Sequence, residues 1–216
     1  MLDLPRPQAV VFDFGGVLFN WQPSKLIQSV LPHHANNDVQ ALDLAAQVFE
    51  SFVPGSDWSE FDRGALSWEE ACARIAARTG LPSVDVNSLM EAIPPHLAPM
   101  PETVSWLKRL KAAGTQLHFL SNMPRPYADF LQREHGFLNQ FQSGVFSCDV
   151  GQIKPNADIF HTAAQQFGIE PALTVFIDDN VHNVKTARDL GWRAVQFVDA
   201  KQCQAELAER GWLPAL

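Results

Sequence analysis

Short apolar runs and helical spacings of apolar residues follow one another along the chain, and the pattern changes twice. Residues 8–14 form an apolar run before Gly15 and Gly16, which predicts a buried strand that ends in a tight turn. From Trp21 to about Pro99 no comparable run occurs, and apolar residues recur at helical spacing instead. Helices are therefore expected over residues 25–31, 39–52, 58–64, 67–79 and 84–93.

A proline-rich passage at residues 94–101 marks a predicted hinge, and helices and strands alternate after it. The expected helices cover residues 102–113, 126–135, 157–167, 181–190 and 202–209, and the expected strands cover residues 116–120, 144–147, 175–178 and 194–198. Strands separated by helices of about ten residues form parallel sheets. The pattern thus predicts an α/β protein with a doubly wound parallel sheet and a helical insert after its first strand. Within that insert, Ser67 and Glu70 have the spacing of a capping box.

The composition favours a globular protein that binds a small molecule. A chain of 216 residues, 46% of them hydrophobic, can form a full core and a second small subdomain. The net charge of −8 provides no basic surface for nucleic acid or for an anionic membrane. Cys72, Cys148 and Cys203 are too widely spaced for a disulfide framework or a zinc finger, so a reducing cytoplasm is expected. Residues 1–7 lack the apolar run of a signal peptide, and no segment reaches membrane-spanning length.

Aspartates follow two of the predicted strands. Asp13 ends the first strand, and Asp178 and Asp179 end a later one. If these strands are neighbours, their carboxyl ends place three carboxylates in one crevice, where open α/β sheets bind ligands. A phosphate charge about 4 Å from a carboxylate is repelled by about 4 kcal/mol at an effective dielectric constant of ~20. A divalent ion held by Asp13 and Asp179 would reverse this repulsion, and oxygen ligands of this kind suit Mg²⁺.

Further residues are candidates for chemistry on a phosphate group. Asp13 precedes glycines that allow close backbone approach, which suits a nucleophile. Ser121 and the backbone N–H of Asn122 follow a predicted strand and can donate to phosphate oxygens, although an ordinary turn is the simpler reading. Lys154 precedes Pro155, which suits the first turn of a helix, so its ammonium group can reach the crevice. A solvated lysine is the alternative.

Together these segments resemble the haloacid dehalogenase-like hydrolase superfamily, in its phosphatase branch. The resemblance rests on residues 12–18 (Phe-Asp-Phe-Gly-Gly-Val-Leu), 120–122 (Leu-Ser-Asn), 154–155 (Lys-Pro) and 176–180 (Phe-Ile-Asp-Asp-Asn), followed by Asn183, Ala187 and Arg188. It implies a Rossmann-like three-layer core with a parallel sheet and an inserted helical cap subdomain of the C1 type. Residues 1–19 and 100–216 would form the catalytic core, and residues 20–99 would form the cap.

The resemblance also implies a role for each of these residues. Asp13 would form an aspartyl-phosphate intermediate, and Asp178 would orient a metal-bound water. The ligands of Mg²⁺ would be Asp13, the backbone carbonyl of Gly15 and Asp179. The phosphoryl group would be held by Ser121, Asn122 and Lys154. Asp13, Lys154 and Asp178 are therefore the expected catalytic residues.

One position departs from the family pattern. Most phosphatases of the family have a second aspartate two residues after the nucleophile as a general acid and base, and this chain has Gly15 there. Loss of such a group costs about 10² to 10⁴ in rate. Residues 61–64 (Phe-Asp-Arg-Gly) resemble a sub-branch that includes sugar-phosphate phosphatases and the N-terminal domain of mammalian-type epoxide hydrolase. A sugar 1-phosphate has a better leaving group than an alkyl phosphate, which fits a chain without the second aspartate.

The sequence therefore predicts a cytoplasmic, Mg²⁺-dependent phosphomonoester hydrolase that acts on a small phosphorylated metabolite, with a sugar phosphate as the expected class. It would be a monomer or a homodimer and bind neither nucleic acid nor membrane. One alternative is a 2-haloacid dehalogenase that uses Asp13 without metal, although retention of Asp178 and Asp179 argues against it. Another is a non-catalytic binding or regulatory domain, because Gly15 replaces the usual acid. Two alternatives stay open for Trp21, Trp58 and Arg63: their side chains face the crevice, or they have ordinary structural roles.

Overall fold

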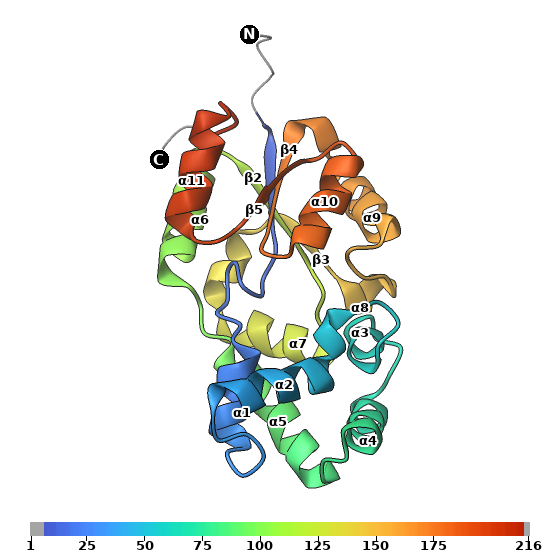
Figure 1. Cartoon of the computed structure of the whole chain (residues 1–216). Helices are drawn as coiled ribbons and strands as arrows, with labels where there is room; N and C mark the ends of the chain where they lie inside the picture. Colours follow the sequence, from blue (N-terminus) through green and yellow to red (C-terminus); the bar gives the residue numbers. More distant parts are fainter. Residues whose placement is uncertain (1–6, 214–216) are drawn as a thin grey trace.

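The computed structural model describes residues 7–213, and a five-stranded parallel sheet forms its centre (Figure 1). The strand order is β3-β2-β1-β4-β5. The strands are β1 (Ala9–Phe12), β2 (Gln116–Ser121), β3 (Ser143–Phe146), β4 (Thr174–Asp178) and β5 (Arg193–Gln196). Central strand β1 pairs in parallel with both β2 and β4, which confirms the predicted α/β fold.

Helices cover both faces of this sheet. They are α6 (Pro101–Ala112), α7 (Arg125–Glu134), α8 (Ser147–Val150), α9 (Ala157–Phe167), α10 (Val181–Asp189) and α11 (Ala200–Glu209), with short 3₁₀ turns η2 (Gly136–Gln140) and η3 (Pro171–Leu173). Alternate residues of β1 point to opposite faces. Phe12 packs with Trp106 of α6, whereas Val11 packs in the cluster that contains Phe160 of α9. The three layers of the predicted core are therefore present.

The helical insert comprises α1 (Pro23–Val30), α2 (Asp38–Phe49), η1 (Glu50–Phe52), α3 (Asp57–Asp62), α4 (Trp68–Thr79) and α5 (Ser83–His96). In Figure 1 these helices lie beyond the carboxyl edge of the sheet. The chain leaves and returns through two paired segments, because Phe19 forms a β-bridge with Pro99. The Met100 N–H donates to the Leu18 carbonyl at 2.8 Å. The assignment of residues 20–99 as a separate cap stays a prediction.

Helix α2 ends earlier than its apolar pattern predicts. The expected helix runs to residue 52, but Glu50, Ser51 and Phe52 have positive φ angles of 47°, 50° and 57°. Arg78 of α4 accounts for the ending, because its guanidinium donates to the carbonyls of Gln47 and Val48, the latter at 3.3 Å. A cation at a helix C-terminus satisfies free carbonyls and opposes the helix dipole.

Helix α5 continues through the prolines that were expected to form a hinge. Pro94 and Pro95 both lie inside the helix, which ends at His96. A proline has no N–H to donate, so Pro94 leaves the carbonyl of Met90 without its helical partner. The hydroxyl of Tyr127, on α7, donates to that carbonyl at 2.9 Å. The proline position thus creates a hydrogen bond between the insert and the core.

Residues 1–6 and 214–216, which the sequence assigns to the core, lie outside the described residues. Over residues 7–213, none of the helices has the length and apolar character needed to cross a membrane. Cytoplasmic location and oligomeric state stay predictions.

Candidate active site

The strand register brings the predicted carboxylates together. Phe12 of β1 is paired with Ile177 of β4, and the Asp13 N–H donates to the Ile177 carbonyl at 2.9 Å. Carboxylate oxygens of Asp13, Asp178 and Asp179 consequently lie within 4.8 Å of one another. The crevice predicted from the two strand ends is present at the carboxyl edge of the sheet.

Lys154 is the cation within this group. Its side-chain nitrogen Nζ lies 2.8 Å from Oδ1 of Asp13 and 2.6 Å from Oδ2 of Asp178, and the residue is 2% exposed. Burial alone would lower the pKa of Lys154, but the charges of Asp13 and Asp178 outweigh it and raise the pKa. Lys154 is therefore a fixed positive charge in the crevice, which was one of the two alternatives from the sequence, and not a solvated lysine.

Asp13 keeps one of its two oxygens available. Its Oδ1 accepts from the Phe14 N–H at 2.7 Å as well as from Lys154. Within residues 7–213, its Oδ2 has no hydrogen-bond or ion-pair partner. Burial raises the pKa of Asp13 to about 7, with Lys154 opposing the shift and Asp178 and Asp179 adding to it. A bound cation would favour the ionised form, which is the form a nucleophile needs.

Asp178 is turned toward the protein and not toward the pocket. Its oxygens accept from Lys154, from the side-chain amide of Asn183 at 3.0 Å and from the Asn180 N–H at 2.8 Å. It is fully buried and is absent from the residues that line the pocket. Its contacts therefore suit a group that holds Lys154 in place. The role of orienting a metal-bound water stays a prediction.

Ser121 and Asn122 both line the pocket at the end of β2. The side-chain amide of Asn122 donates to the Lys154 carbonyl at 2.9 Å and accepts from the Lys154 N–H at 2.9 Å. Asn122 thus fixes the segment that carries Lys154, and only its backbone is left for a ligand. The phosphate-binding roles assigned to Ser121, Asn122 and Lys154 stay predictions.

The donor set at this edge fits a hard divalent cation. Carboxylate oxygens of Asp13 and Asp179 are ligands that Mg²⁺ prefers, and Gly15 lines the same pocket. Gly16 has a φ of 72°, and a Cβ built there would collide with the Asp179 carboxylate. Glycine at position 16 therefore lets Asp179 approach the turn that carries Asp13. Lys154 alone leaves this cluster with excess negative charge, which a cation would offset.

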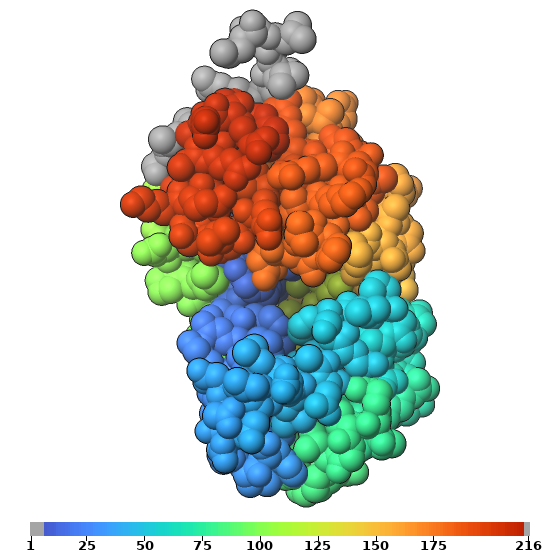
Figure 2. Space-filling view, viewed as in Figure 1, coloured from blue at the N-terminus to red at the C-terminus, as the bar shows by residue number. Residues whose placement is uncertain are grey.

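The pocket over these residues has a volume of about 250 Å³ and lies between the sheet edge and the insert. Figure 2 shows the hollow on one face of the molecule, where the blue-to-green insert meets the orange and red core. Its floor is polar, but its walls are mostly apolar and aromatic. The wall residues are Trp21, Phe52, Trp58, Ile93, Leu97, Met123, Pro124 and Tyr127. The insert and α7 thus enclose an apolar space above the carboxylates.

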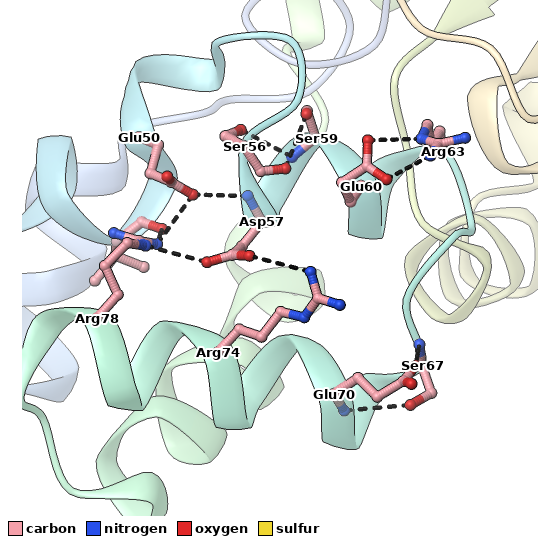
Figure 3. Close-up of polar contacts among 11 residues, drawn as sticks. Glu50, Ser56, Asp57, Ser59, Glu60, Arg63, Ser67, Glu70, Arg74 and Arg78 are labelled. Atoms are coloured by element: carbon pink, nitrogen blue, oxygen red, sulfur yellow. Dashed lines mark hydrogen bonds and ion pairs between the residues drawn. The ribbon is translucent and has the colours of Figure 1, made fainter.

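Three insert residues can now be placed. Trp21 and Trp58 line the pocket, whereas Arg63 forms an ion pair with Glu60 on the insert (Figure 3). Asp62 also lines the pocket and is 7% exposed; it belongs to the segment 61–64 noted in the sequence, which assigned it no role of its own. One signal for it existed: an acidic side chain at the C-terminal end of a helix is unfavourable, so its presence at the end of α3 needs another reason.

Comparison with known proteins identifies the family. A model of the haloacid dehalogenase-like hydrolase family matches residues 7–191. The chain belongs to this family and is a hydrolase. Among curated relatives, it is 26% identical over 204 residues to a sesquiterpene phosphatase of Aspergillus oryzae, covering 94% of this chain and 95% of that protein. It is 28% identical to a flavin mononucleotide hydrolase of Arabidopsis thaliana, covering 71% of this chain and 62% of that protein.

Coverage of other relatives is partial, and the solved structures share the fold at low identity. The hydrolase spans 38% of a drimenol cyclase of Aspergillus calidoustus, to which it is 28% identical. A family enzyme of Bacteroides thetaiotaomicron in complex with magnesium and inorganic phosphate has a TM-score of 0.70 at 20% identity, covering 91% of this chain and 98% of that one. An L-2-haloacid dehalogenase of Xanthobacter autotrophicus has a TM-score of 0.68 at 19% identity, covering 95% and 83%.

Proposed function

We propose that this hydrolase cleaves phosphate monoesters, with Asp13 as the nucleophile. The observation that carries the proposal is the pair of contacts at Asp13. One oxygen is held by Lys154 and the Phe14 N–H, the other has no partner among the described residues, and Asp13 lines the pocket. This leaves one oriented oxygen for in-line attack on phosphorus. The phosphatases among the curated relatives support the same reaction class.

Asp13 and Asp179, with the Gly15 carbonyl, would hold Mg²⁺, and the ion when bound would supply positive charge against the repulsion between carboxylates and phosphate. Lys154 would bind a phosphoryl oxygen from the opposite side, because its ammonium is already fixed between Asp13 and Asp178. Ser121 would donate to a second phosphoryl oxygen from the end of β2. Asp178 would keep Lys154 charged and in position.

The same residues distinguish this proposal from a 2-haloacid dehalogenase. A 2-haloacid dehalogenase displaces halide from carbon without a metal, and its substrate carries one carboxylate. A cluster of uncompensated carboxylates in the site would repel that substrate. Here oxygens of three aspartates lie within 4.8 Å of one another, and Lys154 pairs with only two of them, Asp13 and Asp178. Such a group favours a reaction in which a divalent cation and a phosphate enter together.

The apolar wall of the pocket indicates which kind of organic group the substrate carries. Trp21, Trp58 and Leu97 face the space above Asp13, and the insert offers few polar side chains there. We propose that the leaving group presents a large apolar or ring surface, and not the hydroxyl-rich surface of a free hexose. The sesquiterpene phosphatase named above supports this. A sugar phosphate remains the second candidate, because an indole ring can stack against a sugar face.

The experiment measures phosphate and halide release by the purified protein. The panel is p-nitrophenyl phosphate, a prenyl monophosphate, a hexose phosphate and 2-chloropropionate, each with Mg²⁺ and with excess chelator. The proposal predicts Mg²⁺-dependent phosphate release, with a higher kcat/KM for the prenyl ester than for the hexose ester. Halide release that persists in chelator, without phosphate release, would overturn the reaction class. A preference for the hexose ester would overturn only the apolar substrate.

A further inference from the structure

We propose that Asp62, at the end of α3 in the insert, is the general acid and base of this hydrolase. The inference rests on the phosphatase reaction proposed above and supplies a proton-transfer group that Gly15 cannot. Asp62 lines the same pocket as Asp13, although it comes from a different part of the chain. It is 7% exposed, and over residues 7–213 its carboxyl group has no hydrogen-bond or ion-pair partner.

A buried carboxyl group without a partner is costly unless it has a function or stays protonated. Burial raises the pKa of Asp62 well above its usual range, and the nearby Asp13 adds to this while Lys154 opposes it. A raised pKa favours the protonated form of Asp62, which is the form that a general acid needs. The helix end gives no local reason for an acid at this position.

The other titratable groups that line the pocket already have a proposed role or a hydrogen-bond partner. Asp13 is the proposed nucleophile, Asp179 is a proposed metal ligand, and Lys154 is bound to two carboxylates. The Tyr127 hydroxyl directs its proton to the Met90 carbonyl at 2.9 Å. None of the described residues that line the pocket is a histidine. Asp62 is thus the one described lining group that is free to give and take a proton.

Contacts on both sides hold Asp62 in position. The Ser147 hydroxyl, on α8 of the core, donates to the Asp62 carbonyl and accepts from the Met123 N–H at 2.8 Å. At the other end of α3, Asp57 contacts Arg78 at 3.1 Å and Arg74 at 3.6 Å, as Figure 3 shows. The helix that carries Asp62 is therefore fixed both to the core and to α4, which suits a group that must meet a reacting atom.

The two proton transfers balance across the reaction. In the first step the Asp13 carboxylate forms a bond to phosphorus, the bond from phosphorus to the leaving oxygen breaks, and Asp62 gives its proton to that oxygen. The products are an alcohol, a phosphorylated Asp13 and the Asp62 carboxylate. In the second step a water oxygen attacks phosphorus, Asp62 takes a proton from the water, and the bond to Asp13 breaks. Phosphate leaves, and both aspartates return to their starting states.

The test compares Asp62→Asn with Glu60→Gln, a matched amide substitution on the same helix whose carboxylate pairs with Arg63. The substrates are p-nitrophenyl phosphate and phenyl phosphate, which have similar shapes but different leaving groups. For Asp62→Asn we expect steady-state turnover to fall about 10² to 10⁴-fold, with the larger loss on phenyl phosphate, the poorer leaving group. With p-nitrophenyl phosphate, attack continues while hydrolysis of the intermediate slows. A burst of nitrophenol and phosphorylated protein, detected by intact mass, should therefore appear.

A rescue variant separates proton transfer from folding. A Cβ built at Gly15 makes its nearest contact at 3.8 Å, with Cβ of Trp21, so an aspartate fits there without displacing backbone. Gly15→Asp combined with Asp62→Asn should recover turnover on phenyl phosphate at least tenfold over Asp62→Asn alone.

Three results would overturn the proposal for Asp62 while the wild type still releases phosphate. They are wild-type kinetics in Asp62→Asn, an equal loss on both esters with no burst, and a failed rescue in a variant that unfolds at the wild-type temperature. Absence of phosphate release by the wild type would instead refute the proposed reaction itself. Glu60→Gln should keep wild-type kinetics, and the thermal unfolding of both single variants shows whether the insert is intact.

Discussion

Replacing Lys154 with methionine removes the charge that joins two buried carboxylates and nearly preserves the length of the side chain. The Lys154 ammonium lies 2.8 Å from Asp13 and 2.6 Å from Asp178, and Lys154 is 2% exposed. Without it, Asp178 keeps its amide partner Asn183 but loses its only ion pair among the described residues. The variant must then bury neighbouring negative charges, or protonate them.

The structure sets the size of the expected loss. Removal of one partner from a buried ion pair costs about 3–5 kcal/mol, because the remaining charge stays buried and uncompensated. Lys185 is the matched control, since its ammonium pairs with Asp189 at 2.5 Å but its side chain is 72% exposed. An exposed pair of this kind, four residues apart on a helix, contributes about 0.5 kcal/mol or less. The two lysines thus differ mainly in burial.

The assay is urea-induced unfolding of both variants and the wild type in chelator. We expect Lys154→Met to lose about 3–5 kcal/mol of unfolding free energy and Lys185→Met to lose about 0.5 kcal/mol or less. Adding Asp13→Asn to Lys154→Met should recover part of the loss, because it removes one of the unpaired charges. A loss in Lys154→Met no greater than in Lys185→Met would refute the reasoning that Lys154 compensates buried charge.

Three further predictions concern positions around the site. Gly16→Ala should abolish turnover, because its Cβ would displace the Asp179 carboxylate. Gly15→Ala, whose Cβ makes only an ordinary contact with Trp21 at 3.8 Å, should stay folded and keep Mg²⁺ binding measured by calorimetry. Burial lowers the pKa of His118 from 6.5 to about 4. As pH falls through that range, His118 is protonated in the unfolded chain but stays neutral in the folded protein. Stability should therefore fall between about pH 7.5 and pH 5, and His118→Gln should remove about 2 kcal/mol of that difference in urea unfolding. Arg78→Leu should cost about 1.5–3 kcal/mol in the same assay, because it removes charged hydrogen bonds that join α2, α3 and α4. A cost below about 0.5 kcal/mol would show that this network is unimportant.

The parts of the site that follow from strand ends could be predicted from the sequence. Apolar runs that end in Asp13 and Asp178 predict neighbouring strands, and parallel pairing then brings their carboxyl ends together. The capping box of Ser67 and Glu70 is confirmed, because its two hydrogen bonds join residues only three apart. These features depend on local patterns or on a regular sheet register, and both are visible in a single sequence.

Features that depend on long-range packing could not be predicted in this way. Asp62 lines the pocket, and its backbone carbonyl accepts a hydrogen bond from Ser147, 85 residues later in the chain. Helix α5 continues past Pro94 because the hydroxyl of Tyr127 satisfies the carbonyl that the proline leaves free. Neither contact has a local signature, since the partner lies on another element. The orientation of insert side chains toward the core is therefore the information that the sequence alone lacks.

The central claim is that an oxygen of Asp13 attacks the phosphorus of a phosphate ester. The most direct test is phosphate release from p-nitrophenyl phosphate in Mg²⁺ by the wild type and by Asp13→Asn, with thermal unfolding as the check on folding. The account predicts release by the wild type that stops in chelator, and loss of all turnover in a folded Asp13→Asn. Wild-type release rates in Asp13→Asn would contradict it.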